Sequence, residues 1–342
     1  MRVTIDVTEK CNLICKHCYN RSGNGKHKDF PFEDLIKVLD DLLPLQLTQI
    51  TFTGGEVLLY SEFEELLDYV CDHPNQDFGF ITNGTIPHKR FIKMINSVPN
   101  IDVGVSLDGP TAPIHDFIRG NGSFEKTLSF LKRINRGCIK VTLNKINKDY
   151  YIQFAKLAKE LDLRLQVDCA VRLGRAEDNW TAIGLSPQEQ VIADRAISEA
   201  VKEINVDTSF GVIHKCRLGS EGISSLALAI DVMGNVFPCG CMRDIFFSIG
   251  NVHDQCVTEI INTQNERLQA IKDFYQSRKK LFEANYCKRC VASLSKICLH
   301  DGNCLAMSGA FNPIFPGNTC DFRKIYVNNL IANTYLERKM QG

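Results

Sequence analysis

The segment Cys11-Asn-Leu-Ile-Cys15-Lys-His-Cys18 places three cysteines at spacings of four and three residues in one short loop. The preceding residues, Arg2–Val7, predict a strand that runs into this loop. Cysteine thiolates are the usual ligands of iron–sulfur clusters, and a four-iron cluster takes four. Three local cysteines would leave one iron open, as a catalytic metal site does. Taken alone, the loop also allows a zinc site or unligated thiols.

Composition limits the kinds of partner and compartment. The chain has 342 residues, is 44% hydrophobic and 23% charged, and balances 40 Lys and Arg against 40 Asp and Glu. With no basic stripe or polybasic arm, we expect no nucleic-acid and no membrane partner. We see no signal peptide and no apolar run near the roughly 20 residues of a membrane span, and therefore expect a cytoplasmic protein. In that reducing compartment, fifteen cysteines favour cluster ligation over disulfides.

Strand and helix patterns alternate from residue 1 to about 205. The expected strands are Val3–Val7, Gln49–Thr53, Phe78–Thr82, Asp102–Leu107, Ile139–Asn144 and Arg164–Asp168. The expected helices are Pro31–Leu45, Ser61–Cys71, His88–Ser97, Ser123–Arg136, Asp149–Leu161 and Pro187–Ile204. The alternation predicts a parallel sheet, and six units favour an α/β fold built as a partial (β/α)6 barrel. In such folds the site lies at the carboxyl ends of the strands.

Helix starts and the domain boundary follow from local signals. Ser61, Ser123 and Ser186 are expected N-caps, and Glu64 would complete a capping box with Ser61. We place one domain at 1–205 and a second, cysteine-rich α+β domain at 206–342.

Polar motifs follow several expected strands. They are Thr53-Gly54-Gly55-Glu56, Thr82-Asn83-Gly84, and Ser106-Leu107-Asp108-Gly109-Pro110 with His115 and Arg119 beyond it. Paired glycines let backbone approach a ligand closely, and a glutamate can bind a cationic amine. Taken singly, the glycine motifs are ordinary turns and the arginine is an ordinary surface charge.

Together, the cysteine loop and these motifs resemble the radical S-adenosylmethionine (SAM) enzymes. The resemblance implies a [4Fe-4S] cluster held by Cys11, Cys15 and Cys18, whose open iron is chelated by the amino and carboxylate groups of SAM. It also implies a set of SAM-binding residues. In that set Gly54, Gly55 and Glu56 serve the amino group, Asn83 belongs to the site, Ser106 touches the ribose and Arg119 pairs with the carboxylate. Asp108 and His115 receive no role.

Nine cysteines lie beyond residue 205, and their order resembles the SPASM extension of radical SAM enzymes, which holds two auxiliary iron–sulfur clusters. The gaps after Cys216, Cys290 and Cys298 are longer than in the family pattern. The resemblance assigns Cys287, Cys290, Cys298 and Cys320 to a distal cluster and Cys216, Cys239 and Cys304 to a proximal one. We expect both to be [4Fe-4S] clusters.

Cys241 has three open interpretations. It could be the fourth proximal ligand, or that cluster could be open for a substrate group. As a third possibility, Cys241 could be a thiol that donates a hydrogen atom to a substrate radical, as in related peptide epimerases.

The resemblance implies an enzyme that cleaves SAM reductively and uses the 5′-deoxyadenosyl radical to abstract hydrogen from a peptide, giving an oxidative cross-link or another oxidised residue. The alternatives are peptide epimerisation and oxidation of a sugar alcohol. The sulfatase-maturing branch is disfavoured because Gly240 follows Cys239, where that branch has an Asp base. The expected partners are a peptide substrate and a flavodoxin or ferredoxin reductant. Because the chain starts at the first strand, we also expect either a separate leader-binding protein or a substrate that needs none.

Overall fold

The computed structural model describes residues 1–25, 27–45, 47–208, 227–240, 242–243, 245–262 and 265–273. The chain divides into two compact units. One consists of Arg2–Val212 with Ile230–Met233, and the other of Met1, Ile213–Ala229 and Gly234–Gly342. The domain boundary expected near residue 205 stays a prediction.

Six parallel strands form the sheet of the larger unit in the order β6-β5-β4-β3-β2-β1. They are β1 (Arg2–Thr8), β2 (Gln49–Gly54), β3 (Phe78–Thr82), β4 (Ile101–Ser106), β5 (Cys138–Leu143) and β6 (Arg164–Cys169). Strands that are neighbours in sequence pair in the sheet, so the predicted partial (β/α)6 barrel is confirmed.

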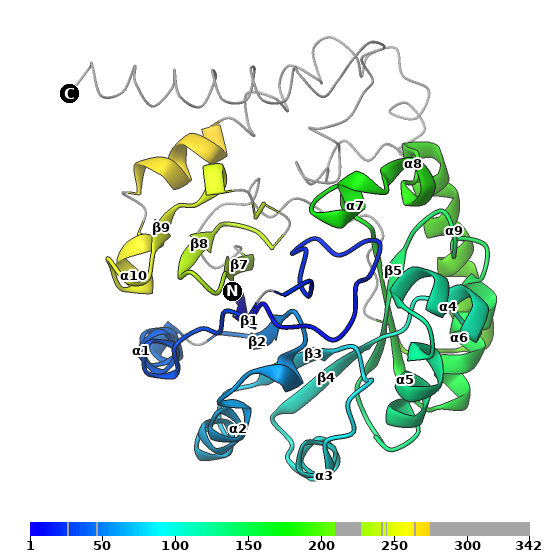
Figure 1. Ribbon diagram of the computed structural model, residues 1–342, viewed down its shortest axis with the longest axis horizontal. Coiled ribbons are helices and arrows are strands. Elements are labelled where there is room, and N and C mark those ends of the chain that lie inside the picture. Colours follow the sequence, from blue (N-terminus) through cyan, green and yellow to red (C-terminus); the bar gives the residue numbers. More distant parts are fainter. Residues whose placement is uncertain are drawn as a thin grey trace. The chain divides into compact units, whose positions relative to one another are not determined.

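Helices follow the strands along the outside of the curved sheet (Figure 1). They are α1 (Phe32–Leu42), α2 (Phe63–Asp72), α3 (Lys89–Ser97), α4 (Ala112–Arg119), α5 (Ser123–Leu131), α6 (Tyr151–Glu160), α7 (Arg175–Asp178), α8 (Trp180–Ile183) and α9 (Pro187–Ile204), with short 3-10 turns η1 (Leu43–Leu45) and η2 (Val57–Leu59). The dark-blue segment after β1 lies within the curve of the sheet.

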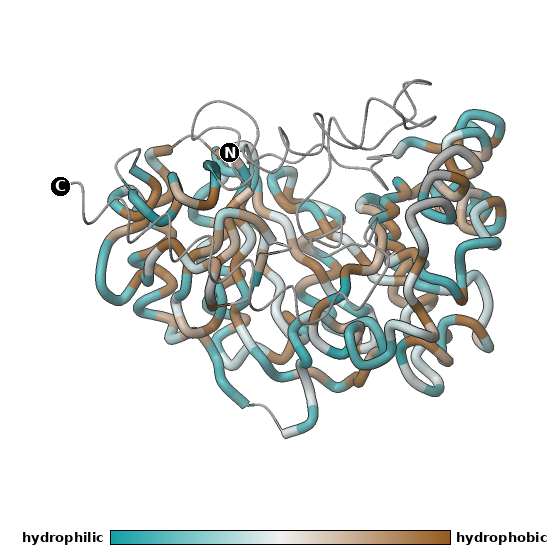
Figure 2. Tube along the Cα trace, turned by 90° about the horizontal axis from the view of Figure 1, so that it is seen from above, coloured by the Kyte–Doolittle hydropathy of each residue, from teal (hydrophilic) through white to brown (hydrophobic). Residues whose placement is uncertain are grey.

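The two faces of the sheet differ in polarity because side chains alternate along each strand. Phe52, Phe78 and Phe80 are fully buried, and the Phe52 ring contacts the other two, with centroids 5.8 Å from Phe78 and 5.3 Å from Phe80. Phe80 also meets Phe63 of α2 and Phe91 of α3. The alternate positions are polar and half-buried on several strands, namely Gln49, Thr51, Asp102, Lys140, Gln166 and Asp168. Hydrophobic and hydrophilic stretches likewise alternate along the helices (Figure 2).

One of the three expected caps is confirmed. Ser186 precedes α9, accepts a hydrogen bond from Glu189 N–H and completes a capping box with it. The Ser61 prediction was wrong, because α2 begins at Phe63 after a Glu62 cap that makes no side-chain bond. The Ser61 hydroxyl instead bonds to the ammonium of Lys10, at 2.7 Å.

The expected cap at Ser123 was also wrong. Ser123 is the first residue of α5, and Gly122 precedes it in the left-handed conformation. The Asp116 carboxylate does the capping, accepting from Gly122 N–H (2.7 Å) and Phe124 N–H (2.8 Å). A longer side chain from the preceding helix has thus displaced the local serine.

The described part of the smaller unit contains strands and short helices, as expected for its α+β class. They are β7 (Ala227–Ile230, whose last residue belongs to the larger unit), β8 (Asn235–Phe237), η5 (Ile245–Phe247), β9 (Gly250–Asn251) and α10 (Val257–Ile260). β8 and β9 are antiparallel, with Val236 opposite Gly250.

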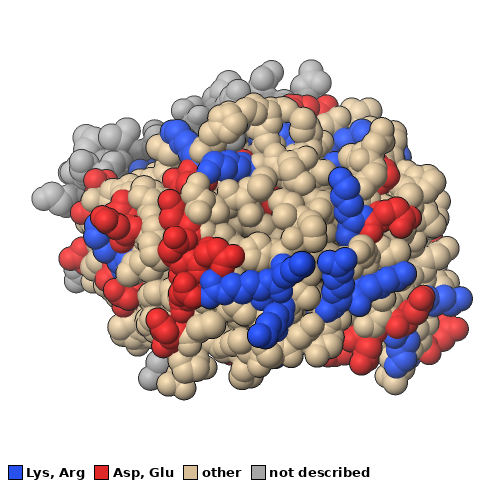
Figure 3. All heavy atoms as spheres, turned by 60° about the horizontal axis from the view of Figure 1, so that its bottom comes forward, with Lys and Arg blue, Asp and Glu red and all other residues tan. Residues whose placement is uncertain are grey.

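Charges of both signs share the face drawn in Figure 3. Across α2 and α3, Arg90 pairs with Glu64 and Asp68. Among the described helices, we find none whose length and apolarity would let it cross a membrane.

Candidate functional site

The cysteine loop leaves the barrel at the end of β1 and is tied together at its base. Glu9 N–H donates to Lys28 O at 2.8 Å. The Asp29 carboxylate pairs with the Lys10 ammonium at 2.5 Å and also accepts from the Thr8 hydroxyl. Both ends of the loop are therefore fixed to the carboxyl end of the first strand.

The three cysteines lie in a partly buried turn of this loop. Cys11 Sγ accepts from Leu13 N–H at 3.5 Å, and Cys18 N–H donates to Cys15 O at 3.3 Å. Burial raises the pKa of the Cys11 thiol to about 12 and that of Cys15 to about 11, and the neighbouring cysteines reinforce the shift. The thiols of Cys11 and Cys15 are therefore protonated at neutral pH unless a metal centre displaces their protons.

The donor set consists of three thiols on one loop, and thiolates are the usual ligands of iron–sulfur clusters. A [4Fe-4S] cluster takes one cysteine on each iron, whereas a single zinc ion needs its ligands within bonding distance of one point. Cys11, Cys15 and Cys18 on one loop thus suit the cluster that the motif predicts.

The segment after β6 supports the same loop. Arg175 donates from Nε to Cys15 O at 2.9 Å and from its backbone N–H to Cys18 O at 2.8 Å. Asn179 Nδ2 donates to Lys16 O at 3.2 Å. The sequence indicates only polar turns for residues 170–186, so this support was missed.

The glycine pair after β2 allows a close approach between two backbone segments. A Cβ on Gly54, whose φ is +138°, would lie 2.3 Å from Thr8 O, and one on Gly55 would lie 2.1 Å from Lys10 O. Gly55 N–H donates to Thr8 O at 2.7 Å. The pair therefore joins β2 to the start of the cysteine loop, and its contact with SAM stays a prediction.

Glu56 is fully buried and bridges the ends of two strands. Its carboxylate accepts from Thr82 Oγ1 (2.5 Å), Asn83 N–H (2.7 Å) and Leu58 N–H (3.2 Å). Burial raises the pKa of this carboxyl, although these donors and Arg119 oppose the shift. The expected interaction with the SAM amino group stays a prediction.

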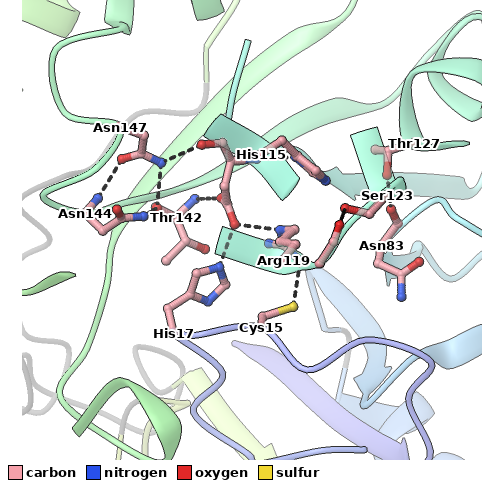
Figure 4. Close-up of polar contacts among 12 residues, drawn as sticks. Cys15, His17, Asn83, His115, Arg119, Ser123, Thr127, Thr142, Asn144 and Asn147 are labelled. Atoms are coloured by element: carbon pink, nitrogen blue, oxygen red, sulfur yellow. Dashed lines mark hydrogen bonds and ion pairs between the residues drawn. The ribbon is translucent and has the colours of Figure 1, made fainter. Parts of the chain in front are cut away.

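Asn83 reaches the cysteine loop from the end of β3. Its Nδ2 donates to Asn12 Oδ1 at 2.9 Å, and its Oδ1 accepts from Thr85 N–H at 2.8 Å. Its backbone carbonyl accepts from Thr127 of α5 at 2.8 Å (Figure 4). The amide is thus oriented beside the residue that follows Cys11.

Arg119 is buried at the end of α4, with 7% of its surface exposed. Its Nη1 lies 3.9 Å from Cys15 Sγ (Figure 4). The structure therefore brings this predicted SAM ligand to a predicted cluster ligand, which an ordinary surface arginine would not do. Ser106 ends β4 and is 9% exposed. Both roles stay predictions.

Two residues without a predicted role lie beside Arg119. Asp108 accepts from Arg119 Nε and contacts His17 Nε2, each at 2.6 Å. Asp108 N–H donates to His115 Nδ1 at 3.1 Å. Burial lowers the pKa of His115 to about 4, so its ring is neutral at pH 7. The polar run Ser106–Pro110 marked Asp108 as a candidate site residue. The sequence did not indicate which residues it would contact, because His17 lies 91 positions away.

Of the predicted auxiliary-cluster ligands, Cys239 lies within the described residues, two positions after β8 and bridged to Ala227. The others lie outside the described residues: Cys216, Cys287, Cys290, Cys298, Cys304 and Cys320, as does Cys241. All these assignments stay predictions.

Comparisons with known proteins agree with the two-part organisation. Residues 5–161 match the radical SAM superfamily, and residues 222–291 match the SPASM iron–sulfur cluster-binding domain. The mycofactocin maturase MftC of Mycolicibacterium smegmatis is 28% identical over 265 residues, covering 73% of this chain and 67% of that protein. The subtilosin biosynthesis protein AlbA of Bacillus subtilis is 24% identical over 336 residues, covering 95% of this chain and 71% of that protein.

The fold is similar to that of SuiB from Streptococcus suis. Its structure bound to S-adenosylmethionine gives a TM-score of 0.70 at 14% identity and covers 90% of this chain and 73% of SuiB. The structure of SuiB bound to the precursor peptide SuiA gives a TM-score of 0.69 at 14% identity. It covers 90% of this chain and 72% of SuiB. Because the matched residues contain both the three-cysteine loop and part of the C-terminal cysteine field, this chain belongs to the radical SAM enzymes that carry a SPASM domain.

Proposed function

We propose that this enzyme oxidises a ribosomally made peptide, forming a cross-link or another oxidised residue. The observation that carries the proposal is the similarity to AlbA, a bacteriocin biosynthesis protein, across 95% of this chain. That similarity spans both the barrel and the cysteine field. MftC is a maturase, and this second relative supports a role in maturation.

The described residues suit the binding steps of this reaction. Cys11, Cys15 and Cys18 would hold the cluster, and bound SAM would supply the 5′-deoxyadenosyl radical. Arg119 would neutralise the SAM carboxylate, for which its forked guanidinium is suited. Ser106, at the end of β4, would contact the ribose.

The polar side chains on the inner face of the barrel suit a substrate with polar groups. Lys140, Gln166 and Asp168 alternate with buried apolar residues on β5 and β6. Gln166 Nε2 donates to Asp168 Oδ2 at 2.8 Å, and Lys140 Nζ lies 3.8 Å from the same oxygen. We propose that this face binds peptide groups and that surplus electrons leave through two clusters in the C-terminal cysteine field. The reductant would be a cytoplasmic flavodoxin or ferredoxin, and a separate protein would bind the leader.

The test is anaerobic co-expression with a short peptide encoded beside this gene, followed by mass measurement in light and heavy water. Loss of two hydrogens is expected. A Cys11→Ala/Cys15→Ala/Cys18→Ala variant should leave the peptide unchanged. Uptake of one deuterium without oxidation would overturn the proposal in favour of epimerisation, with Cys241→Ala as the next variant. An unmodified peptide would also overturn it and direct the search to sugar alcohols.

A further inference from the structure

We infer that Asp108 is a positioning residue for SAM binding, because its carboxylate fixes Arg119 and the cysteine loop to each other. The inference rests on the proposed use of SAM and not on the identity of the substrate.

Both oxygens of the Asp108 carboxylate are engaged, and the side chain is fully buried. Oδ2 accepts from Arg119 Nε at 2.6 Å and lies 2.6 Å from His17 Nε2, while Oδ1 accepts from Thr142 N–H at 2.6 Å (Figure 4). Arg119 belongs to α4, His17 to the cysteine loop and Thr142 to β5. One carboxylate therefore joins three separate parts of the site.

The Asp108 backbone is held as firmly as its side chain. Its N–H donates to His115 Nδ1 at 3.1 Å, and its carbonyl accepts from Asn147 Nδ2 at 2.9 Å. A Cβ on the next residue, Gly109, would lie 2.3 Å from His115 N, so the turn packs directly on α4. The carboxylate cannot follow Arg119 if that side chain moves, and this makes it a fixed reference point.

The bond at Nε determines which part of the Arg119 guanidinium remains available. Nε is bonded to Asp108, so the two terminal nitrogens are the ones that can donate to an anion, and Nη1 is directed toward Cys15 Sγ at 3.9 Å. An arginine side chain loses much rotamer freedom when it binds a ligand, so fixing it beforehand lowers the entropic cost of binding. Asp108 thus orients Arg119 toward the cluster loop.

His17 carries the same restraint into the cysteine loop. It lies between Cys15 and Cys18, and its ring is the loop's contact with the buried carboxylate. Movement of the loop relative to α4 would break this bond. The spacing between the cluster ligands and Arg119 is therefore set by a shared oxygen atom.

The first measurement is the SAM dissociation constant of the anaerobically reconstituted protein, by equilibrium dialysis. For Asp108→Asn we expect an increase of about tenfold or more, since a charge-assisted bond is lost while shape is kept. Iron content should stay near that of the parent protein, because the three cysteines remain. Asp116→Asn is the matched control, since Asp116 lies on α4 with Arg119 but its carboxylate caps α5. It should lower the melting temperature and leave the dissociation constant unchanged.

A double-mutant cycle separates positioning from general damage. In an Arg119→Gln background, Asp108→Asn should add less than about twofold to the dissociation constant, because its effect acts through Arg119. The inference would be overturned if Asp108→Asn raised the SAM dissociation constant by the same factor in both backgrounds. It would also be overturned if Asp108→Asn alone left that constant unchanged. If Asp108→Asn does not fold, His17→Ala tests the loop contact, and an unchanged constant there would overturn the link to the loop. Failure to modify a peptide would bear on the proposed function alone.

Discussion

Replacing Gly174 with alanine tests whether the segment after β6 supports the cysteine loop. Gly174 has φ +58° and ψ −135°, a backbone conformation that L side chains rarely adopt. An added Cβ would lie 2.2 Å from Tyr19 O and 2.5 Å from Cys18 O. Both neighbours are backbone atoms, so neither can move without moving the loop. Gly174→Ala should therefore displace the segment that carries Cys18.

The magnitude follows from two costs. The backbone strain costs about 1–3 kcal/mol, and overpacking against fixed atoms adds about 1–3 kcal/mol. Their sum is about 4 kcal/mol at midrange, which lowers the melting temperature by roughly 12 °C at about 3 °C per kcal/mol. Gly122→Ala is the matched control, since Gly122 has φ +71° but nothing within 4 Å of an added Cβ. It should cost about 1–2 kcal/mol, or roughly 5 °C.

The assay combines thermal unfolding of the apo protein with iron analysis after anaerobic reconstitution. We expect Gly174→Ala to lose much of its iron and Gly122→Ala to keep it. If both variants melt at the same temperature and bind equal iron, the support that we ascribe to the segment after β6 does not exist.

Two further variants probe the anchors of the loop. Arg175→Lys removes the side-chain bond to the Cys15 carbonyl but keeps the backbone bond to the Cys18 carbonyl. Iron analysis should therefore show a smaller loss of iron than for Gly174→Ala. An equal or larger loss of iron would contradict this order. Although burial alone would raise the pKa of Asp29, hydrogen bonds from Lys10 and Ser61 lower it overall. The stabilisation of the fold by ionised Asp29 is therefore present above the pKa that Asp29 has in the unfolded chain. It is lost as the pH falls through the pKa of Asp29 in the folded protein. Asp29→Asn should lower the melting temperature at pH 7 and flatten its fall between roughly pH 5 and 3, whereas an unchanged acid limb would refute this role.

Much of the barrel could be predicted because its signals are local. Each strand of the larger unit alternates apolar and polar residues or is bounded by turn residues, and α9 was predicted from Pro187 to Ile204 as observed. Parallel strands place their carboxyl ends at one edge, so motifs that follow strands had to gather there. The contact of Arg119 with Cys15 is consistent with this reasoning.

The contacts that orient those motifs could not be predicted, because they join residues far apart in sequence. Asp108 meets His17 across 91 positions, and Arg175 meets Cys15 across 160. Nothing in the local pattern around residues 170–186 indicates which loop they will touch. The cap at Ser61 failed for this reason, since its hydroxyl donates to Asp29, 32 positions away, whereas the carboxylate that displaced Ser123 lies only 7 positions away, at Asp116.

The cysteine loop is held from three directions by groups that are not predicted cluster ligands. Asp29 and Lys10 close its base, Asp108 holds His17 from the β4 side, and Arg175 holds two of its carbonyls from the β6 side. None of these restraints uses a cysteine side chain, so we expect them to persist when the three thiols are replaced. Cluster binding must also displace the protons of Cys11 and Cys15, because burial raises the pKa values of both thiols. It follows that replacing all three cysteines should abolish iron binding with little effect on the melting temperature of the apo protein, whereas Gly174→Ala should affect both.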